Sequence, residues 1–117
     1  MRTYLDFSSI IEKTFCKVFQ KGETINFVCA DTGVTYTMEH EQFCCENVFV
    51  ESIIGDLSDL EDTPITFADE SSANDPAASE SGTWTFYKLA TRKGWVDIRW
   101  HGSSNGYYNE SVSFFCK

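Results

Sequence analysis

One short stretch of the sequence combines imidazole, thiol and carboxylate side chains. It runs from His40 to Glu46 and contains the adjacent pair Cys44 and Cys45. All three chemical groups are zinc ligands, which makes these four residues a candidate metal site. Successive side chains of an extended chain point to opposite sides, however, so Cys44 and Cys45 are not expected to hold one ion together. We therefore expect no metal here.

The same stretch also contains the parts of a cysteine nucleophile. His40 would be the base, and Glu41 or Glu46 would orient its ring. Such a site needs an oxyanion hole and a geometry that spacing alone does not establish. In the simpler interpretation Cys44 or Cys45 fills the core, and His40 ends the inward-facing row of its strand. We expect no catalytic residue and no cofactor.

A second candidate site lies on one predicted strand, in which chemically active residues alternate. Trp95, Asp97, Arg99 and His101 share one face of this strand because side chains repeat with a period of two. An arginine beside a tryptophan can stack on and pair with a small anionic ligand such as a nucleotide. The simpler alternative is a salt bridge between Asp97 and Lys88 on a solvated face. The candidate ligand site consists of Trp84, Lys88, Trp95, Asp97, Arg99, His101 and Tyr107.

The charge of the chain is strongly and unevenly negative. Asp and Glu number 18 against 9 Lys and Arg, and the formal net charge is −9. Residues 39–80 contain twelve acidic residues and no Lys or Arg. This balance disfavours direct binding to nucleic acid or to an anionic membrane, and it suits either solubility or a partner protein with a basic surface. The candidate partner-binding residues are Glu51, Asp56, Asp59, Glu61 and Asp62.

The elements that must position these residues are mostly strands. Alternating apolar residues predict strands at 14–20, 25–29, 34–38, 65–68, 83–91, 95–101 and 107–116. Turn residues predict hairpins at 31–33, 92–94 and 103–106. Apolar spacing of three and four predicts short helices at 7–12 and 51–62. The small, polar, acidic residues 69–82 predict a flexible loop.

These elements indicate one domain over residues 1–117. The expected fold class is α+β and mainly β: a single strongly bent antiparallel sheet, or partial barrel, of six or seven strands with one or two short helices. The chain has five cysteines, which is an odd number, and its first residues lack the apolar stretch of a secretion signal. We expect a cytoplasmic protein whose cysteines are reduced.

Two motif strings resemble a family of small uncharacterised proteins, a domain of unknown function found in tailed phages and prophages. The first is Cys44-Cys45-Glu46-Asn47-Val48 followed by Gly55-Asp56-Leu57 and Pro64-Ile65. The second is Thr83-Trp84-Thr85-Phe86-Tyr87-Lys88 followed by Ile98-Arg99-Trp100 and Ser104-Asn105-Gly106-Tyr107-Tyr108. The likeness covers about residues 10–115. It implies a phage or prophage origin and a bacterial host cytoplasm, and it brings no reaction with it.

Together these features favour a non-enzymatic phage accessory protein. It would bind a host component, such as a defence or regulatory factor, through its acidic surface, in part by mimicking the charge of nucleic acid. The alternative is a small-ligand binder that sequesters a nucleotide or a signalling metabolite at the second candidate site.

Overall fold

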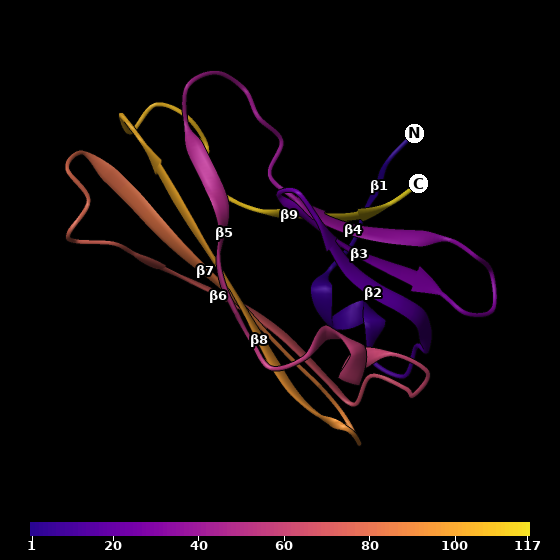
Figure 1. Cartoon of the computed structure of the whole chain (residues 1–117). Coiled ribbons are helices and arrows are strands. Elements are labelled where there is room, and N and C mark those ends of the chain that lie inside the picture. Colours follow the sequence, from indigo (N-terminus) through magenta and orange to yellow (C-terminus); the bar gives the residue numbers. More distant parts are fainter.

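The computed structural model describes all 117 residues as two antiparallel sheets packed face to face (Figure 1). The first sheet has the order β1-β9-β4-β3-β2 and consists of β1 (Thr3–Tyr4), β9 (Ser113–Cys116), β4 (Thr35–Glu39), β3 (Thr24–Cys29) and β2 (Phe15–Lys21). The second has the order β5-β8-β7-β6 and consists of β5 (Asn47–Ile54), β8 (Gly94–Ser104), β7 (Ser81–Thr91) and β6 (Phe67–Asn74). The mainly-β prediction is confirmed, whereas the single bent sheet or partial barrel of six or seven strands is wrong.

The two sheets arise because the chain crosses between them at two connections. Residues 40–46 lead from β4 in the first sheet to β5 in the second. Residues 105–112 lead back from β8 to β9. The tight hairpins at 31–33 and 92–94, both confirmed, pair neighbouring strands within one sheet. Local turn signals predict such pairs well, but they do not show where the chain changes sheet.

The hydrophobic core fills the space between the sheets. Alternation places Ile25 and Phe27 of β3 on its inner face, opposite Ile98 and Trp100 of β8, and all four are fully or almost fully buried. Nineteen buried residues form one cluster, so both sheets share a single core. The indole N–H of Trp100 donates to Met38 Sδ at 3.1 Å, which links the second sheet to β4 of the first.

Both predicted helices are shorter than expected, and neither is an α-helix. The first is the 3-10 turn η1 (Phe7–Ile10), whose two end residues are buried in the core. The predicted helix at 51–62 is wrong over its first half, because β5 continues to Ile54 and only η2 (Leu57–Leu60) is helical. Gly55 ends β5 with φ 104°, and a Cβ there would lie 2.5 Å from the Trp95 carbonyl oxygen. Only glycine fits this close approach.

The acidic segment 69–82 is largely strand, which corrects the prediction of a loop. β6 extends to Asn74, β7 begins at Ser81, and only residues 75–80 connect them. The full register from Phe67↔Ala90 to Asn74↔Thr83 gives this polar edge strand a complete ladder of partners. Tertiary pairing therefore outweighs low β-propensity here. The predicted strand at 107–116 begins only at Ser113.

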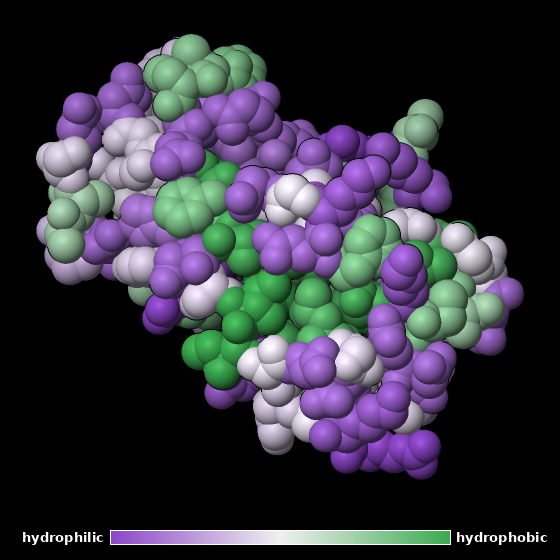
Figure 2. All heavy atoms as spheres, in the orientation of Figure 1, coloured by the Kyte–Doolittle hydropathy of each residue, from purple (hydrophilic) through white to green (hydrophobic).

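The core reaches the surface along one edge of the sandwich. Figure 2 shows apolar atoms gathered where β5 and η2 face β2 in Figure 1. Val50, Ile53 and Leu57 are only partly buried there, and Ile54 is 62% exposed. β5 and β2 are both edge strands, so no further strand covers this margin.

The structure contains no helix with the length and hydropathy of a membrane span.

Candidate functional site

The outer face of the second sheet brings together six of the seven residues of the predicted ligand site. In the register of β7 and β8, Trp84 lies opposite His101, and Lys88 lies opposite Asp97. Arg99 and Trp95 occupy alternate positions of β8 and therefore share this face. Only Tyr107 lies elsewhere, exposed on the connection 105–112.

Aromatic side chains dominate this face, which we call the aromatic face; we define it by Phe49, Phe67, Trp84, Phe86, Trp95, Arg99 and His101. Trp95 is 58% exposed, and its ring lies 5.3 Å from that of Phe67 on β6. The Trp84 ring contacts the edge of His101 at 4.4 Å and stacks on Phe86 at 6.5 Å. Sequence reasoning missed Phe49, Phe67 and Phe86. Phe86 alternates with Trp84 and Lys88 along one strand, so the sequence pattern could have identified it. Phe49 and Phe67 join the face only through strand pairing, which that pattern does not show.

The two basic residues on this side of the sheet, Arg99 of the aromatic face and Lys88 beside it, are already paired with carboxylates. Arg99 Nε donates to Glu51 Oε2 at 2.8 Å, and this hydrogen bond lowers the pKa of Glu51. The predicted pair of Lys88 and Asp97 forms at 4.0 Å. The Arg99 guanidinium also lies 5.2 Å from the centre of the Trp84 ring, within the range of a cation–π contact.

A shallow hollow of about 430 Å³ lies in the middle of this face. Its lining combines apolar, cationic and anionic side chains, namely Ser52, Ile54, Asp69, Phe86, Lys88, Asp97 and Arg99. The hollow is thus large enough for a small ligand and is bordered by both signs of charge.

The outer face of the first sheet has a different character. Thr24, Asn26 and Thr37 lie there side by side, and the Asn26 side chain hydrogen-bonds both threonines, at 2.9 and 3.1 Å. Polar side chains that hydrogen-bond one another in this way are typical of a sheet face exposed to solvent. The same cross-strand row also contains Phe19 of β2 and Phe115 of β9, so both outer faces carry phenylalanine, whereas Trp84 and Trp95 lie on the second sheet alone.

The predicted acidic partner surface is divided by the fold. Glu51 lies beside the aromatic face and pairs with Arg99, whereas the other four carboxylates surround η2. Asp56 caps η2 by accepting from the Ser58 N–H at 3.0 Å. Glu61 accepts from the Val18 N–H of β2 at 2.9 Å. Asp62 stands in a left-handed turn with φ 62°, and Asp59 lies within η2 before this turn.

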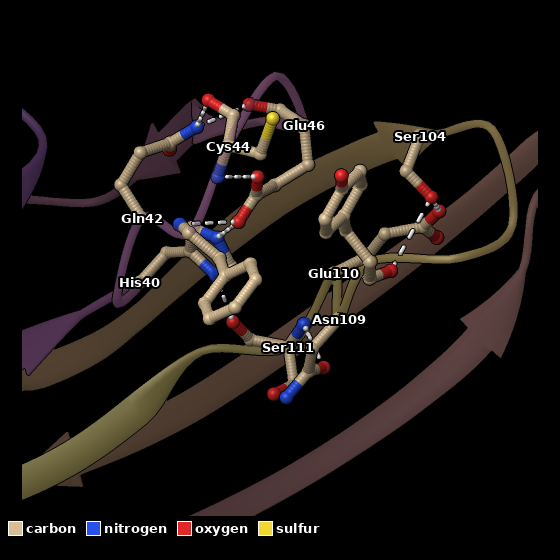
Figure 3. A network of polar contacts seen from close by, with 10 residues as sticks. His40, Gln42, Cys44, Glu46, Ser104, Asn109, Glu110 and Ser111 are labelled. Atoms are coloured by element: carbon tan, nitrogen blue, oxygen red, sulfur yellow. Dashed lines mark hydrogen bonds and ion pairs between the residues drawn. The ribbon is translucent and has the colours of Figure 1, made fainter.

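A buried hydrogen bond between His40 and Glu46 lies within the 40–46 connection, and His40 also links this connection to the 105–112 connection (Figure 3). The side chains of His40 and Glu46 are 5% and 0% exposed, and His40 Nε2 lies 2.8 Å from Glu46 Oε2. The other ring nitrogen, Nδ1, donates to the Ser111 carbonyl oxygen at 2.6 Å. Both ring nitrogens therefore face an oxygen acceptor, and the ring is held from both sides.

The backbone of the 40–46 connection completes the shell around Glu46. Its carboxylate accepts from the N–H groups of Phe43 and Cys44, each at 2.8 Å. Burial alone would raise the pKa of Glu46, but the hydrogen bonds from Cys44, His40 and Phe43 outweigh it and lower this pKa to about 2. The carboxylate is therefore ionised at neutral pH and acts as the centre of the connection.

A second buried carboxylate, Glu110, holds the 105–112 connection. It accepts from Thr83 Oγ1 at 2.8 Å and from Ser104 Oγ, so it links the connection to β7 and β8 (Figure 3). Burial would raise the pKa of Glu110, but these hydroxyl hydrogen bonds lower it. Glu110 and Ser111 were not singled out from the sequence, because nothing in their spacing indicates burial.

The four residues weighed as a metal or nucleophile site, His40, Cys44, Cys45 and Glu46, do not come together as one site. His40 and Glu46 are buried and engaged with each other, while Cys44 and Cys45 are exposed. No group of three or more His, Cys, Asp or Glu side chains lies together in a metal-binding arrangement. Neither ring nitrogen of His40 is free to take a proton from a thiol. The expectation that Cys44 or Cys45 fills the core is also wrong, since Cys29 is the buried cysteine.

Comparisons with known proteins identify the family but no activity. A search of curated proteins found no match, and neither did a search of solved structures. The family model described as a domain of unknown function, DUF7448, matches residues 8–114. Because this match spans nearly the whole chain, the protein belongs to the DUF7448 family.

Proposed function

We propose that this protein is a non-enzymatic binding module that docks a partner protein on its aromatic face. The observation that carries the proposal is the concentration of Trp84, Phe86, Trp95 and Phe67 on one open sheet face, beside Arg99. Tryptophan, phenylalanine and arginine are enriched in the centres of protein interfaces and depleted from ordinary surface. An exposed apolar face of this kind is otherwise costly for a monomer.

The charges around the aromatic face favour a basic partner. Arg99 and Lys88 are paired with Glu51 and Asp97, so little free positive charge is left for an anion. Asp69 adds a further carboxylate to the hollow. A net charge of −9 would also steer a basic protein toward this chain. The acidic contact surface expected from the sequence thus becomes, in this proposal, the rim of an aromatic one.

The resemblance to phage and prophage proteins suggests where such a partner would be found. We propose a component of the bacterial host, such as a defence or regulatory factor that this protein inhibits or modulates. Charge mimicry of nucleic acid would contribute to recognition if that component normally binds nucleic acid.

Trp95→Ala is expected to weaken partner binding by at least about 30-fold, since truncating a central aromatic residue typically costs 2 kcal/mol or more. The measurement is cross-linked capture of proteins from a bacterial lysate on the immobilised chain, followed by the Kd of the purified partner. Tyr107→Ala is the matched control, because Tyr107 is also an exposed aromatic residue but lies off the face. Equal losses in both variants, or unchanged binding in Trp95→Ala, would refute this assignment. Affinity that does not fall between low and physiological salt would refute the acidic rim and its attraction of a basic partner.

A second candidate function is supported by the hollow itself. A planar anionic ligand, such as a nucleotide, would stack on Phe86, which lines the hollow, and pair with Arg99. Arg99→Ala should then abolish ligand retention in native mass spectrometry and leave the melting temperature unchanged. Lys17→Ala is the control, because Lys17 lies 4.8 Å from the Phe19 ring on the other sheet and is an equivalent cation–aromatic pair. Retention that survives Arg99→Ala would exclude this function.

A further inference from the structure

The adjacent thiols Cys44 and Cys45 lie exposed at a bend of the 40–46 connection. Sequence alternation alone would place them on opposite sides of an extended chain, but the chain bends at these two residues. Both thiols are exposed on this bent segment, so the two side chains are not held on opposite sides as they would be on a strand.

Two hydrogen bonds hold the backbone of Cys44 at this bend. The Cys44 N–H donates to Glu46 Oε1 at 2.8 Å, and the Cys44 carbonyl accepts from Gln42 Nε2 at 3.1 Å. Glu46 is in turn fixed by the buried contact with His40. Figure 3 shows Cys44 hydrogen-bonded to Gln42 and Glu46 through its backbone. The backbone that carries Cys44 is therefore ordered before a ligand arrives.

We propose that Cys44 and Cys45 form a dithiol site for a soft, thiophilic ion that is held by two sulfurs, such as Cu(I) or trivalent arsenic. Soft thiolate ligands select such ions over harder cations. The surrounding negative charge of the chain also favours a cation.

The geometry favours a bridging ion over a disulfide between these cysteines. Consecutive Cα atoms are about 3.8 Å apart, which is shorter than the roughly 4.4–6.8 Å that an unstrained disulfide spans. A bridging ion replaces the single S–S bond by two ion–sulfur bonds, so the two sulfurs need not approach each other as closely as in a disulfide.

Phenylarsine oxide is a direct probe of this site. Its arsenic stays trivalent and forms two As–S bonds, while the oxygen leaves as water with the two thiol protons. We expect intact-mass spectrometry of the full chain to show one phenylarsenic group that persists in excess glutathione. Cys44→Ser and Cys45→Ser should each lower retention by at least about 100-fold, because the second bond is then no longer intramolecular. Titration with Cu(I) against a chromophoric chelator will show whether the site also takes that metal.

Cys16→Ser is the matched control, since Cys16 is exposed but has no neighbouring cysteine in sequence. This variant should keep full retention, and all variants should keep the wild-type melting temperature because the three thiols are exposed. An adduct that glutathione removes from the wild type, or one that survives in Cys44→Ser, would overturn the proposal. The result is independent of partner binding, because the aromatic face lies on other elements.

Discussion

Replacing Trp100 with alanine is expected to lower the free energy of unfolding by about 3–5 kcal/mol, which is typical for removing a buried tryptophan side chain. Trp100 has no exposed surface and packs between the sheets, and its N–H reaches Met38 of β4. Small domains are stable by only about 5–15 kcal/mol, so this loss would leave a marginal fold. Urea unfolding followed by circular dichroism measures it.

Trp95 provides the matched control for this substitution, because it lies on the same strand but on the outer face. Trp95→Ala removes the same atoms from a position that is already 58% exposed, and it should cost less than about 1 kcal/mol. Similar losses in the two variants would mean that the core does not lie between the sheets as described. The contrast also separates the binding role of Trp95 from any role in folding.

Replacing His40 with alanine is expected to lower the free energy of unfolding by about 3 kcal/mol, because it leaves the buried Glu46 carboxylate without its ionic partner. Glu46 would keep the N–H groups of Phe43 and Cys44, which limits the loss. His101→Ala is the control. His101 contacts Asp75 at 2.7 Å, but its side chain is 17% exposed, so water can replace the lost contact and the expected cost is below about 1 kcal/mol. A loss in His101→Ala as large as in His40→Ala would contradict the role of His40 in linking the 40–46 and 105–112 connections.

The same ion pair predicts a pH dependence of stability. The pKa of Glu46 falls from the ordinary 4.5 to about 2 in the folded chain, so its stabilising contribution is complete above pH 4.5 and is lost as pH falls toward 2. Glu46→Gln lacks this contribution. The difference in unfolding free energy between wild type and Glu46→Gln should therefore be largest at neutral pH and should shrink steadily below pH 4.5. A difference that stays constant from pH 6 to pH 2.5 would show that Glu46 is not held ionised by its neighbours.

Much of the local structure could be predicted from the sequence. The alternation of Ile25, Phe27 and Cys29 predicts a half-buried strand, and the turns at 31–33 and 92–94 predict hairpins that the structure confirms. Alternation also predicts that Trp95, Asp97, Arg99 and His101 share a face. These features depend on backbone geometry within a few residues, so a short window of sequence contains the physical information that determines them.

Other elements were predicted wrongly because short-range patterns are ambiguous. The spacing of Ile53, Leu57 and Leu60 fits one stripe of a helix, yet Ile53 completes a strand paired with β8. The polar residues of β6 have weak strand propensity, yet they pair along the whole of β7. In both cases the secondary structure is determined by backbone hydrogen bonds to a strand that is distant in sequence. A short window of sequence does not include that strand.

The sequence by itself determined a mainly-β chain with strong hairpins, an excess of negative charge and one strand with an aromatic and charged face. Only the tertiary structure decided that there are two sheets, that Phe67 joins Trp95, and that His40 meets Ser111 and Glu46. Residues 40 and 111 are 71 positions apart, and they come together because the chain changes sheet once in each direction at the same end of the sandwich. His40 and Glu46 are buried because these distant segments meet. Local sequence therefore does not predict their contact, nor the bend at Cys44 and Cys45 that Glu46 supports.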